Sequence, residues 1–289
     1  MLNNKQMIAR LRHIYHRLTR PAPYSIEKAL LAGTHRTASR QPSILHFSLN
    51  KAATQYTKNI LRAIAAENNL TPVGMNEWAF GSTQPYLDHL SALQMEQYKH
   101  VFRPAGYLYS VFGGMVENID NLAAYKILLM VRNPRDILVS SYFSAAFSHP
   151  LPGEKSDKRA AFLERREHAK SIGIDAFTLE EAPRLLANLQ RYQQWLLTPC
   201  PHVLVLRNED MILDFKAWLS EIVAYTGCSI SEKLETGLVE KHMAAKPLRE
   251  DKMRHLRKGV AGDFLEKLKP ATIGQLDALF APIEHRFGY

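Results

Sequence analysis

The sequence predicts a single α/β domain with a central parallel sheet flanked by helices. The run KILLMV at 126–131 is apolar throughout, as expected of a strand buried on both faces of a parallel sheet. SILHFS at 43–48 and HVLVLR at 202–207 are similar, and segments with helical periodicity separate the three runs. A chain of 289 residues, 46% of them hydrophobic, has the size and composition to fold around one large core.

The remaining elements follow in order along the chain. After the strand at 43–48 we expect a helix over about 54–68, and GYLYSV at 106–111 predicts a further strand. Apolar residues at helical spacing predict a helix near 180–197 and another after the strand at 202–207; they are Leu185, Leu189, Tyr192 and Leu196, then Phe215, Leu219, Ile222 and Val223. The polar segment 148–170 is predicted to be a long loop at the sheet edge that forms part of a substrate site.

Cysteine content and hydropathy limit the class of protein. Cys200 and Cys228 are too few for a disulfide framework or a four-cysteine zinc site, which fits a reducing compartment. No apolar stretch approaches the ~20 residues of a membrane span, and the N-terminus lacks the apolar core of a signal peptide. We therefore expect a cytoplasmic protein, and its net charge of +9 indicates an anionic partner.

Residues 1–40 are predicted to form a basic helical segment that is packed on, or appended to, a domain at 41–289. Residues 1–20 carry five Lys and Arg and no acid, the first acid being Glu27, and apolar residues recur beside these cations at helical spacing: Met7, Leu11, Ile14 and Leu18. Such a helix either docks on the parent domain or contacts a membrane surface peripherally. A second stretch rich in Lys and Arg covers 241–259.

The stretch VRNPRDILVSSYF at 131–143 places an arginine where a buried strand ends. Arg132 is costly to bury without an anion, and a strand end in a parallel sheet is where such folds bind ligands. Asn133 as a cap, Pro134 in the first turn and Asp136 at the positive end of the dipole predict a helix start. Ser140, two turns along, would face the same crevice. The alternative is an arginine in a salt bridge with a neighbouring loop.

The first strand also leads directly into a helix, through KAATQY at 51–56. Successive backbone N–H groups at such a junction form a nest for phosphate oxygens, to which Lys51 adds a cation and Thr54 and Gln55 add side-chain donors. A Walker A loop would need glycines before the lysine, and here they are absent. A surface lysine at a strand end explains the same residues.

Three segments resemble the motifs of PAPS-dependent sulfotransferases. SLNKAATQY resembles the 5′-phosphosulfate loop, and VRNPRDILVSSY is very similar to the 3′-phosphate motif, with Arg132 and Ser140 at the family's spacing. HLRKGVAGDF at 255–264 resembles the RKGxxGDW loop that folds over the cofactor. The resemblance implies a sulfuryl transfer from 3′-phosphoadenosine 5′-phosphosulfate (PAPS) to a hydroxyl acceptor, with no metal and no nucleic acid as partner.

The same resemblance implies a set of cofactor-binding residues. The 5′ side would be held by Lys51, Ala52, Ala53, Thr54, Gln55 and Tyr56, the 3′-phosphate by Arg132, Ser140, Arg257, Lys258 and Gly259, and Asn208 would lie near adenine. Lys51 would also neutralise the leaving group. Acceptor hydroxyls on carbohydrate, lipid or a small metabolite all fit.

Some positions depart from the family pattern. Ala53 stands where glycine is frequent, so we expect a loop without a strongly positive φ there. Gln55 replaces a threonine, Asn208 a tyrosine and Phe264 the tryptophan of GDW. Tyr56 either stacks on adenine or belongs to the core.

The catalytic base is the least defined residue of the predicted site. The segment that carries a histidine in cytosolic members reads YLYSVFGG here, with Ser110 near that place. NEWAF at 76–80 resembles the glutamate segment of glycosaminoglycan sulfotransferases, and aromatic neighbours of Glu77 would raise its pKa. The alternatives are a surface role for Glu77 and a histidine base, His89, His100 or His149.

Two other functional classes remain open on the sequence. One is a degenerate sulfotransferase fold that binds the nucleotide without turnover, which the retained Lys51, Arg132 and Ser140 argue against. The other is a nucleoside kinase or NTPase, which the position of the lysine in KAATQY argues against.

Overall fold

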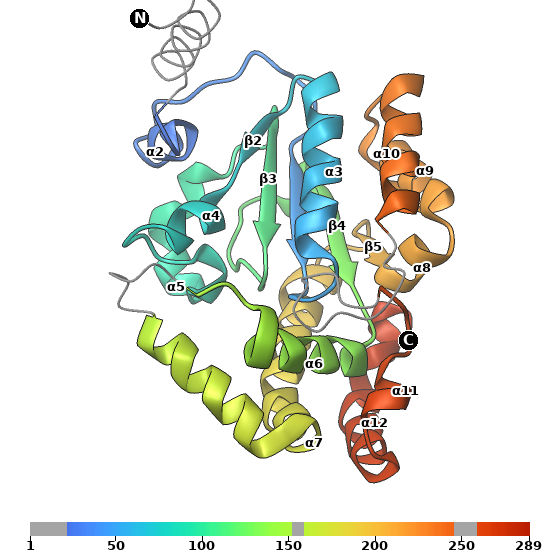
Figure 1. Cartoon of the computed structure of the whole chain (residues 1–289). Helices are drawn as coiled ribbons and strands as arrows, with labels where there is room; N and C mark the ends of the chain where they lie inside the picture. The colour runs from blue at the N-terminus through green and yellow to red at the C-terminus, as the bar shows by residue number, and fades with distance from the viewer. Residues whose placement is uncertain (1–21, 152–158, 246–258) are drawn as a thin grey trace, which may run out of the picture.

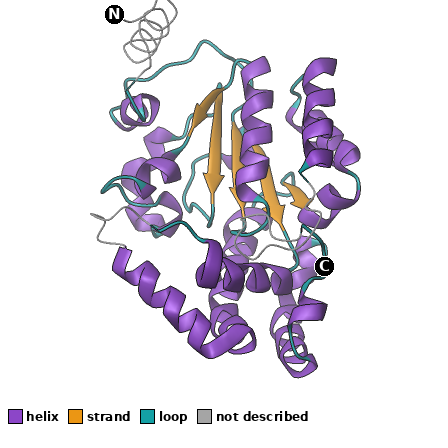
Figure 2. Cartoon of the chain, viewed as in Figure 1, coloured by secondary structure: helices purple, strands orange, loops and turns teal. Residues whose placement is uncertain are grey.

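A computed structural model describes residues 22–151, 159–245 and 259–289, and it confirms the predicted fold class. Five strands form one all-parallel sheet in the order β2-β3-β1-β4-β5, with helices around it (Figures 1 and 2). The strands are β1 (Ile44–Ser48), β2 (Thr71–Val73), β3 (Tyr107–Phe112), β4 (Lys126–Val131) and β5 (Leu204–Arg207). The helix expected over the first 20 residues lies outside the described ranges.

Helices connect the strands and account for most of the remaining chain. The longer ones are α2 (Ser25–Leu31), α3 (Thr54–Glu67), α6 (Pro134–Phe143), α7 (Arg159–Tyr192), α9 (Phe215–Thr226), α10 (Glu232–Ala244) and α12 (Pro270–Glu284). The shorter ones are α4 (Met75–Phe80), α5 (Ala92–Met95), α8 (Asn208–Leu213) and α11 (Phe264–Lys267). The four predicted strands and the three predicted helices are confirmed, whereas β2, only three residues long, was not predicted.

The sheet topology sets the position of the site. β1 is central: the chain leaves it toward β2 and β3 on one side, then returns to place β4 and β5 on the other. The loops after β1 and β4 therefore depart in opposite directions from neighbouring strands, which is the switch point where open α/β sheets bind ligands. In Figure 1 the strand arrowheads point toward α6, so these loops lie beside that helix.

The three central strands, β1, β3 and β4, are buried on both faces, as their apolar sequences predict. Every residue of β1 and β3 is buried, and all of β4 except Lys126. Phe47 of β1 packs its ring against Tyr192 of α7, with centroids 6.0 Å apart. The next residue toward the N-terminus, His46, points to the opposite face because side chains alternate along a strand.

The segment predicted as a long polar loop, 148–170, is different in the structure. α7 begins at Arg159, so 159–170 is helical, while 152–158 lie outside the described residues. The many charged residues of this segment are those of a solvated helix, and a left-handed Gly173 (φ 75°, ψ 175°) breaks α7 between this half and the next. The second half continues into a π-helical turn, η5 (Gln193–Leu197). Together they cover the helix that was predicted near 180–197.

The described part of the basic N-terminal segment, 22–40, packs against the sheet. Buried Glu27 of α2 accepts a hydrogen bond from Gly74 N (2.7 Å), and His35 Nδ1 lies 2.9 Å from the Tyr107 hydroxyl of β3. No helix in the described ranges is both long enough and apolar enough to cross a membrane.

Candidate functional site

The loop after β1 has a backbone shaped for an anion. Lys51 (φ 75°) and Ala53 (φ 58°) both adopt the left-handed conformation, so the expectation that Ala53 avoids a positive φ is wrong. The Thr54 hydroxyl fixes the loop by hydrogen bonds to Leu49 O (3.2 Å) and Ser48 Oγ (2.9 Å). The first N–H groups of α3 have no partners within the helix and face this loop, as in a phosphate nest.

The Lys51 ammonium is held in a mostly buried position. It donates to the hydroxyl of Ser144 (2.5 Å), the first residue of a π-helical turn, η4 (Ser144–Ser148), that follows α6. Burial, and then the positive charge of Arg165, lower the pKa of Lys51 to about 8. An anion placed beside this ammonium would offset both the cost of burying its charge and the repulsion from Arg165. Ser144 could not be predicted from the sequence, because the π-helical turn SAAFS that holds it has no local pattern that marks a contact with Lys51.

Arg132 lies at the carboxyl end of β4, as predicted, and reaches the loop after β1. Its guanidinium donates to Lys51 O (3.2 Å) and, at 3.4 Å, to Val260 O, and lies 3.7 Å from Asp136. The side chain is only 14% exposed, and its Nε is buried without a partner among the described residues. A guanidinium with two long contacts to carbonyls and an unused N–H is equipped to bind an anion.

Asp136 has a second role beyond the predicted helix start. Asn133 caps α6 through Arg135 N and Pro134 occupies its first turn, both as predicted. The buried Asp136 carboxylate, however, accepts hydrogen bonds from Gly262 N (2.8 Å) and Phe264 N (3.0 Å), tying the C-terminal loop to Arg132. Burial raises the pKa of Asp136, while Arg132 and the two N–H groups act in the opposite direction.

Glu209 anchors the same turn from the other side. The Asn133 N–H donates to Glu209 Oε1 (2.9 Å), and the Tyr289 hydroxyl donates to Glu209 Oε2 (2.6 Å). Asn208, predicted near adenine, is buried at the start of α8 beside Glu209. Sequence reasoning missed Glu209 and Tyr289 because their contacts join residues far apart in the chain.

The remaining predicted cofactor residues are distributed as follows. Ser140 is half-buried on α6, and Ala52 is buried in the loop after β1. Tyr56 contacts Phe215 and hydrogen-bonds His242 (3.0 Å), which is the core packing that the sequence left as an alternative. Gly259 has a positive φ (66°), whereas Arg257 and Lys258 lie outside the described residues.

Glu77 is in α4, and two cations of α3 hold it. Its carboxylate binds Lys58 and Arg62, and the Lys58 ammonium also binds Gln55. Burial raises the pKa of Glu77, but the hydrogen bonds and charges of Lys58 and Arg62 outweigh it and leave that pKa below its ordinary value. The rise in pKa expected from aromatic neighbours is therefore wrong.

The three candidate histidines occupy different places. His89 is mostly exposed, and His100 contacts Leu31 O (2.8 Å). His149 follows η4 and lies near Lys51; burial and the neighbouring cations lower its pKa. Ser110 of β3 bonds instead to the buried His46 (2.8 Å), a histidine that the sequence did not single out. Among the described residues, no group of three or more His, Cys, Asp or Glu side chains is arranged to hold a metal ion.

Comparison with known proteins identifies relatives of this arrangement. A family model described as the sulfotransferase domain matches residues 42–288. In structure, the chain resembles mouse sulfotransferase SULT7A1 complexed with PAP, at 18% identity and a TM-score of 0.54 over 91% of this chain and 90% of that one. Retinol dehydratase, complexed with androsterone and inactive cofactor PAP, has 16% identity and a TM-score of 0.46 over 91% and 88%. No curated protein matches in sequence.

Proposed function

We propose roles for the site residues from the premise that this chain belongs to the sulfotransferase domain family and is a PAPS-dependent sulfotransferase. The observation that carries the proposal is the contact between Arg132 and the backbone of Lys51, which brings together the loops of two neighbouring strands. One loop presents a nest and an ammonium, and the other presents a guanidinium. Two separate anions on one ligand, as PAPS has, match this pair of cations.

The donor groups fit the two ends of PAPS. The loop after β1, with Lys51, Ala52, Ala53, Thr54 and Gln55, would bind the 5′-phosphosulfate through backbone N–H groups and the ammonium. Arg132 has an unused, buried Nε, and Ser140 is half-buried on α6, eight residues further along the chain, so we propose that these two bind the 3′-phosphate. Gly259, with Arg257 and Lys258, would close over the same phosphate.

Lys51 would contribute most to the rate. In a sulfuryl transfer the acceptor oxygen attacks sulfur in line, while the bond from sulfur to the bridging oxygen breaks and that oxygen gains negative charge. The Lys51 ammonium is the cation of this loop, and its interaction with that charge grows as the bond breaks. An interaction that is stronger in the transition state than in the ground state lowers the barrier.

Glu77 remains our prediction for the base that takes the acceptor proton. Its ion pairs with Lys58 and Arg62 favour the alternative, a carboxylate that fixes α4 to α3. Glu77→Gln separates the two roles, because glutamine keeps the size and one acceptor oxygen. A base predicts a rate about 10²–10⁴-fold lower at unchanged PAP affinity. A structural role predicts a lower melting temperature with near-normal turnover per folded molecule.

The proposal on the cofactor is tested by calorimetry. PAP, which has a 3′-phosphate, should bind much more tightly than 5′-AMP, which lacks one. Equal affinity for the two nucleotides would contradict the roles of Arg132 and Ser140. A parallel screen with labelled PAPS over carbohydrate, lipid and small-metabolite hydroxyls would identify the acceptor class.

We also propose that residues 41–289 form the catalytic domain and that it acts in the cytoplasm, with 1–40 as an appended basic segment. Basic residues of that segment support a peripheral contact with anionic membranes. Sedimentation with phosphatidylserine vesicles, compared with phosphatidylcholine vesicles, tests the membrane contact in the full chain. Equal sedimentation with both would contradict it.

A further inference from the structure

A second group of cations surrounds Lys51 from the side of α7. The turn η4 joins the two: its first residue, Ser144, accepts the Lys51 hydrogen bond, and its neighbours bind Arg166 of α7. Arg166 donates to His149 O (2.6 Å) and, at 3.4 Å, to Ala145 O. The same short turn and the residue after it therefore contact both the proposed leaving-group lysine and an arginine of α7.

These α7 arginines have few counter-charges. The contacts of Arg166 in the described ranges are to carbonyl oxygens, and none is to a carboxylate. Arg165 pairs with Glu181 (2.9 Å) and lies over the ring of Phe177, but Glu181 also pairs with Arg184 (2.7 Å). The Glu181 carboxylate is thus shared by Arg165 and Arg184, and this group of three side chains keeps a net positive charge.

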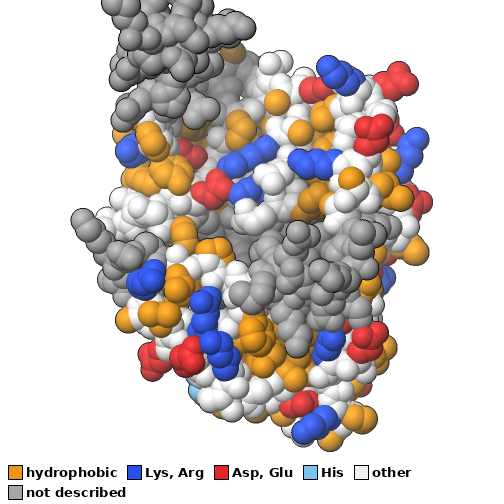
Figure 3. All heavy atoms as spheres, viewed as in Figure 1, with side chains coloured by type: hydrophobic (Ala, Val, Ile, Leu, Met, Phe, Trp, Pro, Cys, Tyr) orange, Lys and Arg blue, Asp and Glu red, His pale blue; other side chains and the backbone are white. Residues whose placement is uncertain are grey.

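Electrostatics place this charge beside the reaction centre. Burial, and then the charge of Arg165, lower the pKa of Lys51; burial, and then the charges of Lys51, Arg165 and Arg166, lower the pKa of His149. Figure 3 shows Lys and Arg side chains, with Asp or Glu side chains beside them, over the first half of α7 on this face of the molecule. The donor nucleotide has a lysine for its 5′ group and an arginine for its 3′-phosphate, so the α7 cations are additional to both.

We infer that the acceptor carries an anionic group besides its hydroxyl, and that Arg165 and Arg166 bind that group while the hydroxyl faces Lys51. This inference rests on the proposed function and names the substrate class for the same site. A carboxylate, phosphate or sulfate on the acceptor satisfies the chemistry, because a guanidinium binds each of them with paired hydrogen bonds.

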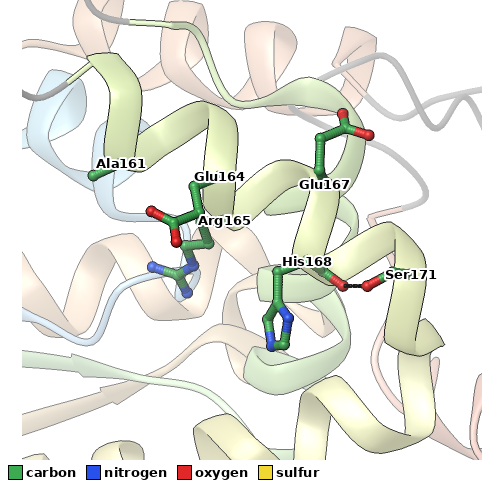
Figure 4. A pocket seen from close by; sticks show the side chains of 6 residues that line it. All are labelled: Ala161, Glu164, Arg165, Glu167, His168 and Ser171. Atoms are coloured by element: carbon green, nitrogen blue, oxygen red, sulfur yellow. Dashed lines mark hydrogen bonds between the residues drawn. The ribbon is translucent and has the colours of Figure 1, made fainter.

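A nearby hollow on α7 does not serve this purpose. Figure 4 shows this open depression, which is lined by Ala161, Glu164, Arg165, Glu167, His168 and Ser171. Its two carboxylates would repel an anion. Exposed Glu164 points to the same side as Arg165 in Figure 4, yet no ion pair joins the two in the described part of the chain. The inferred site lies toward η4 and Lys51 instead.

The test compares pairs of hydroxyl compounds in which one member carries an anionic group and the other is neutral, on protein whose donor site is saturated with PAP. The pairs are 4-hydroxybenzoate with 4-hydroxybenzamide, glucuronate with glucuronamide, and glycerol 3-phosphate with glycerol. Calorimetry measures binding of each compound, and labelled PAPS measures transfer to it. In wild type at low salt, the anionic member of at least one pair should bind at least fivefold more tightly, and high salt should weaken that preference.

Two variants assign the preference to Arg165. Arg165→Gln should lower the charge preference at least twofold, with Arg166 retaining the remainder, while changing PAP affinity less than twofold. Arg184→Gln is the matched control, because it removes an ion pair with the same Glu181 but no charge beside Lys51, and it should keep the preference. Melting temperatures of both variants report any loss of folding.

Several outcomes would overturn the inference. The inference would be wrong if the protein binds PAP but binds the two members of every pair equally. It would also be wrong if the PAP-bound protein binds neither member of any pair. An unchanged preference in Arg165→Gln would overturn it as well. A loss of PAP affinity in that variant would also overturn it, because it would assign Arg165 to the donor. Failure of wild type to bind PAP at all would instead contradict the proposed function, and this inference with it.

Discussion

The loop after β1 and the turn after β4 leave neighbouring strands at the same edge of the sheet, yet they are stabilised in different ways. The loop after β1 owes its shape to the backbone, with left-handed residues at Lys51 and Ala53 and a hydroxyl that bonds within the loop. The turn after β4 depends on carboxylates, with Asp136 and Glu209 binding it to distant segments. Backbone shape suits a group that reacts, whereas anchored side chains suit a group that is only held.

The largest effect on activity is expected in the loop after β1, which we propose binds the 5′-phosphosulfate. Lys51→Ala should lower turnover about 10²–10³-fold and lower PAP affinity much less, because the lysine interacts most strongly with charge that appears in the transition state. Initial rates and PAP calorimetry measure the two quantities. Lys216→Ala, at an exposed lysine, serves as the control. If PAP affinity alone falls, Lys51 binds the nucleotide and does not assist the leaving group.

At the turn after β4, which we propose binds the 3′-phosphate, a substitution should change the affinity for PAP. Arg132→Ala should weaken PAP by about 2–4 kcal/mol, the loss typical of truncating one partner of a buried charge pair. Calorimetry with 5′-AMP is the internal control, because that nucleotide has no 3′-phosphate to lose. An equal loss for both nucleotides would mean that Arg132 supports the fold of the loop after β1 instead.

A smaller effect tests the anchoring carboxylates. Asp136→Asn should weaken PAP binding by about 1–2 kcal/mol, since a buried charged hydrogen-bond acceptor is replaced by a neutral amide and the Gly262–Phe264 loop loosens. Asp277→Asn is the matched control: Asp277 binds Arg135 of the same helix (2.5 Å) but does not contact that loop. Similar losses of PAP affinity in both variants would indicate a general effect on α6.

The charge state of Lys51 can be tested by measuring how many protons the protein takes up when it binds PAP. Its pKa of about 8 means that the ammonium is largely deprotonated at pH 8.5, and an anion beside it favours the charged form and raises that pKa. Binding of PAP at pH 8.5 should therefore take up a fraction of a proton, and binding below pH 7 should take up none from Lys51. Calorimetry in buffers of different ionisation enthalpy measures the uptake, which Lys51→Ala should abolish.

The smallest effect concerns the backbone of the loop after β1. Ala53→Gly should raise the free energy of unfolding by about 0.5–1 kcal/mol, because glycine adopts a φ of 58° without the penalty that alanine incurs. Chemical denaturation measures this change, and the rate should stay within a factor of two. A destabilised glycine variant would show that the cost of ordering glycine exceeds the relief of strain.

The two loops also differ in how well the sequence predicted them. Apolar runs predicted β1 and β4, and with them the positions of Lys51 and Arg132, because burial of a parallel strand leaves a local signature. The anchors could not be predicted: Asp136 is 126 residues from Gly262, and its partners are backbone N–H groups, which look alike at every position. The helix over 159–170 was also missed, because a mostly exposed helix lacks the apolar stripe that periodicity detects.

The first half of α7 rests on a small hydrophobic cluster of its own. Ala146, Ala169 and Phe177 form this cluster, apart from the large core that the sheet organises. Gly173 interrupts the helix where this half joins the next. Substitutions at the exposed positions of 159–172 should therefore cost the rest of the molecule little stability. If the inferred acceptor site is correct, substitutions in this half of α7 can change which acceptor is bound while the nucleotide site stays the same. The half-helix is therefore a suitable segment for evolving or engineering acceptor specificity.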